Sequence, residues 1–326
     1  MKIRKTHFYL GLIVFVAIIG AVVYYIAVSK DKTANIEPNV QVPQWNVNAD
    51  GYLSYPLERG TVKFSRSDLE GNASILVSKL IFQSRGSNIY GLLVTPAYAE
   101  TLPPGIVLLP GAGVSKESEL ELAKSIAELG IVVLVLDQRG TGETDGYFPN
   151  LDEDFASFMS NAEPYQNLMV YDALRAFDLL DQAPFVDSER IIIAGESLGG
   201  RIATIAAAID RNIHGALIIS SAGLDFNEKG DINKDRFLKS IDSDHYIDLI
   251  TPRKIVMIHS INDSIIPLRS AANTFSKAEE PKQFILINDT SCNHGYCDAM
   301  WPSLVESLDY LTNIRSRTLV SVPETP

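Results

Sequence analysis

A serine lies at the centre of a five-residue motif that could carry nucleophilic chemistry. The motif reads Gly195-Glu196-Ser197-Leu198-Gly199, directly after the apolar run RIIIA and directly before a helical pattern. A G-x-S-x-G sequence between a strand and a helix is typical of a nucleophile elbow, whose tight turn presents the serine Oγ above a sheet. We therefore predict that Ser197 is the nucleophile of a hydrolase.

A serine hydroxyl is a weak nucleophile and needs an adjacent base that is oriented by an acid. In proteins with this elbow the acid and then the histidine follow the serine along the chain. His294 is the candidate base, because it alone falls in a loop after the last predicted strand and before the last predicted helix. The remaining histidines lie in the basic N-terminal flank or within or at the start of predicted elements: His7, His214, His245 and His259.

Two aspartates compete for the role of the acid. Asp263 follows the predicted strand KIVMIHS (254–260), whereas Asp289 comes shortly before His294. Because Asp289 is too close to His294 in sequence to come from a different strand end, we predict Asp263 as the acid.

An acyl-transfer site also needs two backbone N–H donors for the oxyanion. The residue after the nucleophile, Leu198, is expected to supply one. The second donor is expected from the loop Pro110-Gly111-Ala112-Gly113, where the amide of Ala112 is favoured and that of Gly113 is the alternative.

Two cysteines, Cys292 and Cys297, flank His294 and are the only cysteines in the chain. A disulfide would stiffen the loop of His294 and suits an exported domain. Zinc binding through both cysteines and His294 and a pair of free thiols are the alternatives. We favour the disulfide.

The elements that position these residues alternate along the chain. Apolar runs of the kind found in parallel strands buried on both faces alternate with helical patterns. The runs are GIVLLP (105–110), IVVLVLD (131–137), RIIIAG (190–195), GALIISS (215–221), KIVMIHS (254–260) and QFILIND (283–289). Before them, SILVSKLIFQS and NIYGLLV, joined by Arg85-Gly86-Ser87, predict a β-hairpin. The pattern predicts an α/β protein with a doubly wound, mostly parallel sheet.

Two further segments complete this scheme. A loop is predicted from the end of IVVLVLD to Glu163. Residues 225–252 are predicted to form either a short lid or a surface helix.

From about Gly91 to Leu311 the chain resembles the α/β-hydrolases of the dienelactone-hydrolase and prolyl-oligopeptidase-like branch. The resemblance rests on LLVTP, VLLPGAG, LVLDQRGTGET, FVDSERIIIAGESLGG, IHSINDSIIP and NHGY, in this order. It implies the α/β-hydrolase fold, with Ser197, Asp263 and His294 at the family's triad positions. It also implies that Asp137 and Arg139, in LDQRGTGET, shape the loop at the end of their strand, with substrate contact as the alternative. The chain departs from the pattern at Pro110, where many relatives have histidine, and in using serine where dienelactone hydrolase itself uses cysteine.

The N-terminal region predicts a membrane anchor. Residues 8–28 form an uncharged apolar run preceded by Lys2, Arg4 and Lys5. Such a run is long enough to span a bilayer as a helix, and the basic flank places the rest of the chain outside the cytoplasm. The alternative is a cleaved signal peptide ending near Ala27-Val28-Ser29, which would give a secreted protein.

The predicted organisation has four parts. A basic flank and transmembrane signal anchor (1–30) lead into a Pro-containing linker (31–58), which is followed by the catalytic domain (59–315) and a tail (316–326). A formal net charge of −12 argues against nucleic acid as a partner, because neutralising phosphates requires a basic face.

The sequence predicts a serine esterase that acts on a small acyl substrate through a Ser-His-Asp triad and an acyl-enzyme. This chemistry requires no metal or organic cofactor. A small-substrate peptidase, a thioesterase and a non-catalytic tethered binding protein of the same fold are the alternatives.

Overall fold

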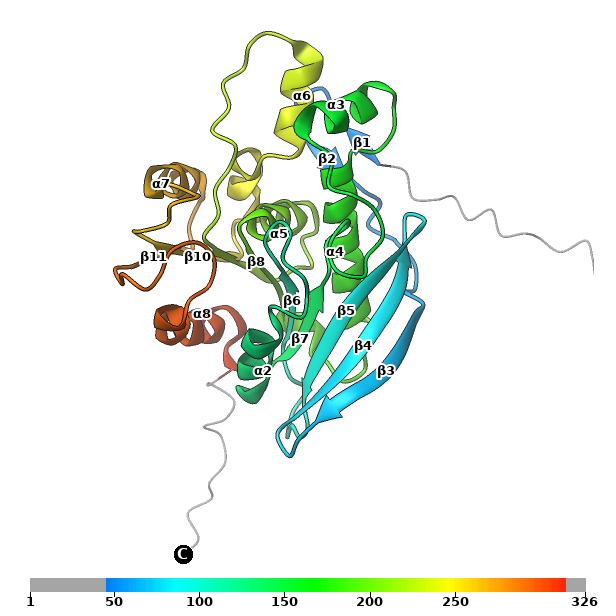
Figure 1. Ribbon diagram of the computed structural model, residues 1–326, viewed down its shortest axis with the longest axis vertical. Helices are drawn as coiled ribbons and strands as arrows, with labels where there is room; N and C mark the ends of the chain where they lie inside the picture. Colours follow the sequence, from blue (N-terminus) through cyan, green and yellow to red (C-terminus); the bar gives the residue numbers. More distant parts are fainter. Residues whose placement is uncertain (1–44, 315–326) are drawn as a thin grey trace, which may run out of the picture. The chain divides into compact units, whose positions relative to one another are not determined.

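The computed structural model describes residues 45–314, which belong to one compact unit beginning at Pro43 (Figure 1). Within this range a nine-stranded sheet has the order β11-β10-β9-β8-β6-β7-β5-β4-β3, and β1 and β2 form a separate hairpin. The strands are β1 Asn46–Val47, β2 Leu53–Ser54, β3 Phe64–Gly71, β4 Ile75–Ser84, β5 Ser87–Pro96, β6 Gly105–Leu109, β7 Val132–Leu136, β8 Ile191–Glu196, β9 Gly215–Ile219, β10 Lys254–Ser260 and β11 Lys282–Ile287.

The sheet has a parallel part and an antiparallel part. From β7 through β6, β8, β9 and β10 to β11 all neighbours pair in parallel, and β6, β7, β8 and β9 are buried along their whole length. This burial explains the continuous runs of Ile, Val and Leu, because both faces of these strands are covered. The predicted hairpin is confirmed: β4 and β5 are antiparallel and turn at Arg85 and Gly86, with Ser84 opposite Ser87.

Helices cover both faces of the sheet. They are α2 Leu120–Glu128, α3 Leu151–Met159, α4 Tyr165–Asp181, α5 Leu198–Ile209, α6 Ile232–Ser240, α7 Leu268–Lys277 and α8 Trp301–Thr312. Short 3₁₀ helices lie at Ser188–Arg190, Ser243–His245, Ile247–Ile250 and Asp298–Met300. The buried side chains of α4, α5 and α7 join one hydrophobic core, and those of α2 and α8 join the other. The predicted doubly wound α/β fold, of the α/β-hydrolase type, is therefore confirmed.

The loop predicted between β7 and Glu163 contains a helix, α3, so this part of the prediction was wrong. Asn150 caps α3 by accepting from the N–H groups of Asp152 and Glu153, and Glu153 returns a bond to the Asn150 N–H. Such a capping box satisfies the first free N–H groups of a helix. The capping residues are visible in the sequence. The helix was nevertheless missed, because nine residues with few buried positions give no clear helical period of apolar residues.

Helices α3 and α6 pack together beside the β1–β2 hairpin, at the top of Figure 1. Phe237 of α6 is fully buried, with its ring 5.5 Å from that of Phe155 and 5.7 Å from that of Phe158. Trp45 extends the cluster, because its ring lies 6.2 Å from Phe158. We call α3, α6 and the β1–β2 hairpin the cap. The segment 225–252, predicted as a lid or a surface helix, thus contributes α6 to a structure built from three separate parts of the chain.

Residues 45–58 were assigned to the linker, but they belong to the fold. Val47, Leu53 and Tyr55 are buried in the main core. The Leu53 N–H donates to the Tyr246 Oη over 2.7 Å, and the Tyr55 hydroxyl donates to the Asn167 carbonyl over 2.7 Å. The linker prediction failed here because the apolar residues are too few and too irregular to show a period in the sequence.

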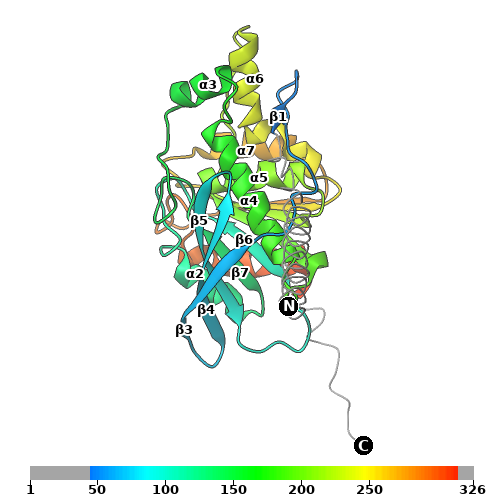
Figure 2. The ribbon, with the colours of Figure 1, turned by 90° about the vertical axis from the view of Figure 1, so that its right-hand side faces the viewer.

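The apolar run at residues 8–28 lies outside the described residues, as does the tail. Figure 2 draws both ends of the chain as thin traces. Within residues 45–314, no helix is long and apolar enough to cross a membrane.

Candidate active site

Ser197 occupies the sharp turn between β8 and α5. Its backbone has φ 51° and ψ −117°, a combination that costs energy for a residue with a Cβ and marks a functional position. The turn lies so close to the end of β6 that a Cβ on Gly199 would collide with the carbonyl oxygen of Leu109, and position 199 therefore requires glycine. The Ser197 N–H donates to the Ile219 carbonyl over 3.0 Å, and the Ser221 hydroxyl donates to the Ser197 carbonyl over 2.6 Å. The predicted elbow is thus held between β6 and β9.

Asp263 and His294 are hydrogen-bonded to each other. The His294 Nδ1 lies 2.9 Å from Asp263 Oδ2 and 3.0 Å from Oδ1. The Asp263 side chain has no exposed surface, and its Oδ1 also accepts from the N–H groups of Ile265 and Ile266 at 2.9 and 2.8 Å. The His294 side chain is 24% exposed. Because a carboxylate only accepts, Nδ1 carries the proton, and Nε2 is left free to act as a base.

The rival residues Asp289 and His259 make other hydrogen bonds, although His259 Nε2 lies 4.0 Å from Asp263 Oδ2. Asp289 has its carboxylate occupied by the N–H and hydroxyl of Ser291, which lower its pKa, and it makes no hydrogen bond to His294. His259 is buried inside β10, with Nε2 donating to the Ile266 carbonyl over 3.0 Å. Burial lowers the pKa of His259, so this imidazole stays neutral near pH 7.

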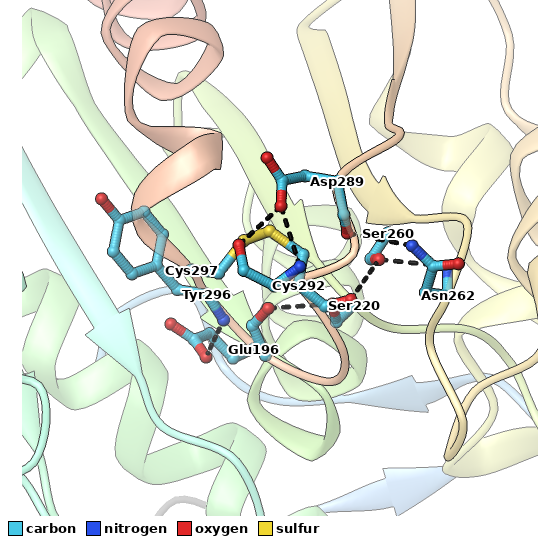
Figure 3. The surroundings of a disulfide bond; sticks show 10 residues. Glu196, Ser220, Ser260, Asn262, Asp289, Cys292, Tyr296 and Cys297 are labelled. Carbon is cyan, nitrogen blue, oxygen red and sulfur yellow. Dashed lines mark hydrogen bonds between the residues drawn. A yellow bond between two sulfur atoms is a disulfide. The ribbon is translucent and has the colours of Figure 1, made fainter.

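The loop of His294 is attached directly to the elbow. The Tyr296 N–H donates to Glu196 Oε2 over 2.9 Å, and the Ser220 hydroxyl donates to the Gly295 carbonyl over 3.2 Å (Figure 3). Glu196 directly precedes the nucleophile, and Gly295 directly follows the histidine. The three residues predicted for the triad therefore lie on neighbouring loops at the carboxyl edge of the parallel strands.

The oxyanion donors were predicted at Leu198 and Ala112. Leu198 is the first residue of α5, so its N–H has no acceptor within the helix and lies at the positive end of the helix dipole. Gly111 borders the nucleophile, because a Cβ built on it would lie 3.6 Å from the Ser197 Cβ. The Pro110 carbonyl accepts from the Gln138 side-chain amide, and Ala112 is exposed. The loop from β6 thus lies beside Ser197, where a second donor is needed.

The two cysteines are joined in a disulfide, with their Cα atoms 5.6 Å apart (Figure 3). The bond closes a six-residue ring that contains His294. Both thiols are thereby used, so the zinc alternative has lost its sulfur ligands. Among the described residues, no group of His, Cys, Asp and Glu side chains could hold a metal ion.

Asp137 and Arg139 hold the loop that follows β7. The Asp137 carboxylate, fully buried, lies 2.7 Å from the buried Lys116 Nζ. The Arg139 Nε lies 2.6 Å from Asp172 of α4, and its terminal nitrogen also donates to the Ser84 carbonyl. These contacts are internal and support the structural interpretation.

Sequence reasoning missed a carboxyl pair at the elbow, Glu119 and Glu196. Glu196 is the second residue of the G-x-S-x-G motif, a position that the motif leaves free. Glu119 directly precedes α2, and its carboxyl group lies within hydrogen-bonding range of Glu196. Only the fold brings them together, since 76 positions of sequence separate them and no local pattern marks Glu119.

The strand order, the elbow and the late histidine define an α/β-hydrolase. Residues 58–287 match the acetyl xylan esterase (AXE1) family, so the chain belongs to that family. The family makes it a hydrolase of carboxylic ester bonds. The matched region includes Ser197 and Asp263 and ends shortly before His294.

Individual relatives are distant. The chain is 22% identical over 224 residues to the protein YfhR of Salmonella typhimurium, which covers 63% of this chain and 70% of the relative. It is 23% identical over 302 residues to the acetyl esterase Axe7A of Xylanibacter ruminicola, covering 82% and 68%. Among solved structures, an acetyl xylan esterase from Paenibacillus sp. R4 superposes with a TM-score of 0.65 at 19% identity, covering 78% of this chain and 90% of that one.

Proposed function

We propose that the chain is a serine esterase in which Ser197 attacks the ester carbonyl while His294 accepts its proton. Asp263 orients the imidazole and stabilises the imidazolium, and the amides of Leu198 and Ala112 stabilise the oxyanion. His294 then returns the proton to the leaving alcohol. A water molecule, deprotonated by the same histidine, releases the acid and regenerates Ser197.

The observation that carries the proposal is the hydrogen-bonded pair of His294 and buried Asp263, tied to a strained serine elbow. A binding protein of the same fold would have no need of this combination. Backbone strain at Ser197 is unfavourable for stability alone, and the buried Asp263 carboxylate is stabilised by the same hydrogen bonds that orient His294.

The substrate class we propose is an ester of a short acyl group, with acetyl esters of sugar hydroxyls first. Membership of the acetyl xylan esterase family supports this choice. The finer resemblance to the dienelactone-hydrolase and prolyl-oligopeptidase-like branch is retained as part of the proposal, through VLLPGAG, LVLDQRGTGET and IIIAGESLGG.

The test is covalent labelling with a fluorophosphonate probe, together with hydrolysis of p-nitrophenyl acetate, butyrate and octanoate and of acetylated xylo-oligosaccharides. We expect the wild-type chain to be labelled and to prefer acetyl esters, and Ser197→Ala to lose both activities. Matched p-nitroanilide and thioester substrates test the peptidase and thioesterase alternatives. A folded wild-type chain that is neither labelled nor active contradicts the proposal.

We also propose that residues 8–28 anchor the chain in a membrane, with the esterase domain on the extracytoplasmic side. The uncharged run and the flanking Lys2, Arg4 and Lys5 support this topology. The bilayer is then a partner of the chain. Fractionation tests it: the full chain should remain with membranes after washing in carbonate, and a chain beginning at Pro43 should not. Recovery of the uncut full chain in the soluble fraction contradicts the anchor.

A further inference from the structure

Two carboxyl groups lie buried beside the nucleophile elbow. Glu196 ends β8, Glu119 directly precedes α2, and each residue has only 7% of its surface exposed. Among the ion pairs between described residues, none involves either carboxyl group. Placing two acidic groups together without a cation is unfavourable if both are ionised. Their arrangement therefore needs an explanation beyond packing.

The hydrogen bond between them requires a proton. The two side chains lie within hydrogen-bonding range of each other, yet ionised carboxylates have only acceptor atoms. Glu196 Oε1 is buried, and among the described residues no N–H or neutral hydroxyl donates to it. A protonated Glu119 carboxyl supplies the missing donor. Burial, and then the charge of Glu196, raise the pKa of Glu119 to about 8, and burial raises the pKa of Glu196.

The second oxygen of Glu196 holds the histidine loop. Oε2 accepts the Tyr296 N–H over 2.9 Å, a bond drawn in Figure 3. Gly295 packs on the same oxygen, because a Cβ there would lie only 3.0 Å from Oε2. Glu196 also interacts electrostatically with His294, whose charge lowers the pKa of Glu196. One carboxylate thus contacts the two residues that follow His294 in its loop.

We propose that Glu119 and Glu196 share a single proton and act together as positioning residues for His294. The inference rests on the proposed function and deepens it. Protonated Glu119 fixes the Glu196 carboxylate, and the ionised Glu196 fixes the loop of the catalytic histidine through Tyr296. Loss of the shared proton leaves two adjacent buried carboxylates, which repel each other and disturb the Tyr296 bond.

The charged and titratable groups at the pair come from two segments, the one before α2 and the one after β11. Glu119 belongs to the loop before α2, whereas His294 and Tyr296 belong to the loop after β11. Burial raises the pKa of Tyr296, with the charges of Asp298 and Glu196 adding to the effect, so its phenol stays neutral in the range concerned. Glu119 is accordingly the group whose ionisation near pH 8 switches the pair.

The decisive variant is Glu119→Gln in the full chain, assayed for kcat and KM from pH 6 to pH 10. A glutamine is isosteric and donates an N–H to Glu196 Oε1 at every pH, without a proton to lose. We expect the wild-type kcat to fall by about tenfold between pH 7.5 and pH 9.5, with KM changing little. The variant should lose at most about twofold over the same range. Superimposable alkaline profiles overturn the inference.

Two variants of Glu196 test the positioning role separately. Glu196→Gln can still accept the Tyr296 N–H, whereas Glu196→Ala has no acceptor. We expect kcat at pH 7.5 to fall at least about tenfold further in the alanine variant than in the glutamine variant, with similar KM. Equal kcat values for both variants overturn the role of the Tyr296 bond.

Failure of the inference is distinguishable from failure of the proposed function. If the wild-type chain is labelled by fluorophosphonate and hydrolyses esters, the function stands and the Glu119→Gln profile alone decides the pair. A folded wild-type chain without labelling or turnover overturns both. Because Glu119→Gln preserves size and hydrogen bonding, it decides the question even if Glu196→Ala fails to fold.

Discussion

Asp263 accepts three N–H groups with its fully buried carboxylate: those of Ile265 and Ile266 and the ring Nδ1 of His294. The two backbone bonds fix the carboxylate, and the fixed carboxylate then selects the histidine tautomer with the proton on Nδ1. Orientation and tautomer are therefore set by the turn that follows β10. A residue that merely supplied negative charge would not need these bonds.

Replacing Asp263 by Asn should preserve the turn and remove the activity. The amide oxygen can still accept from the backbone, but the NH₂ group then faces His294 and forces the proton onto Nε2, so the base is lost. We expect kcat for p-nitrophenyl acetate to fall by about 10³–10⁴-fold with a nearly unchanged melting temperature. Asp289→Asn is the matched control and should stay near wild type. A kcat within tenfold of wild type for Asp263→Asn contradicts the assignment.

For the individual catalytic residues, the sequence predicted much of the site. The elbow, its position between a strand and a helix, and the late loop containing His294 all follow from local pattern and chain order. The choice of Asp263 over Asp289 matches the hydrogen bond that the structure shows. The proximity of Glu119 to Glu196 could not be predicted, because 76 residues separate them in sequence and only the tertiary structure brings them together.

The loop between β11 and α8 is held at several points. The Ser260 hydroxyl donates to the Cys292 carbonyl over 3.0 Å, and the Ser220 hydroxyl donates to the Gly295 carbonyl. Glu196 accepts the Tyr296 N–H, and the disulfide closes the ring. Because the hydrogen bonds anchor the loop independently, the disulfide adds rigidity to a loop that is already placed.

Removing the disulfide should therefore weaken the site without abolishing it. Closing a ring of this length contributes about 2 kcal/mol by chain entropy, so we expect Cys292→Ala/Cys297→Ala to lose about that much stability. We expect kcat to fall by about threefold to tenfold, since the histidine samples more positions. Urea unfolding and kcat measurements check both effects. The wild-type chain after reduction with dithiothreitol is the control, and it should match the double variant; unchanged stability in both contradicts the expectation.

The elements that were predicted best are those whose partners cover both faces. β6, β7, β8 and β9 are continuous apolar runs, and their identity as strands needs no knowledge of distant contacts. α3 was missed because its stability depends on α6 and Trp45, which lie far away in sequence. Short elements with one buried face owe more to such contacts than to intrinsic propensity.

The folded domain begins before the first strand of the large sheet. Val47, Leu53 and Tyr55 are buried in the main core, and Tyr55 and Leu53 also hydrogen-bond to Asn167 and Tyr246. Burying a side chain of this size contributes about 1.5–3 kcal/mol. Three such residues together amount to a large part of the typical net stability of about 5–15 kcal/mol. The β1–β2 hairpin is thus part of the folding unit, although no strand of it joins the large sheet.

A chain beginning at residue 59, the predicted start of the catalytic domain, should therefore be much less stable than one beginning at Pro43. We expect its free energy of unfolding to be lower by about 4 kcal/mol or more, because the cap loses Trp45 and the core loses three buried side chains. Urea unfolding and limited proteolysis of the two chains check this. Leu57→Ala in the longer chain is the matched control, since Leu57 is 68% exposed and its loss should leave stability within about 0.5 kcal/mol. Equal unfolding midpoints for the two chains would mean that the hairpin docks on a domain that is already complete without it.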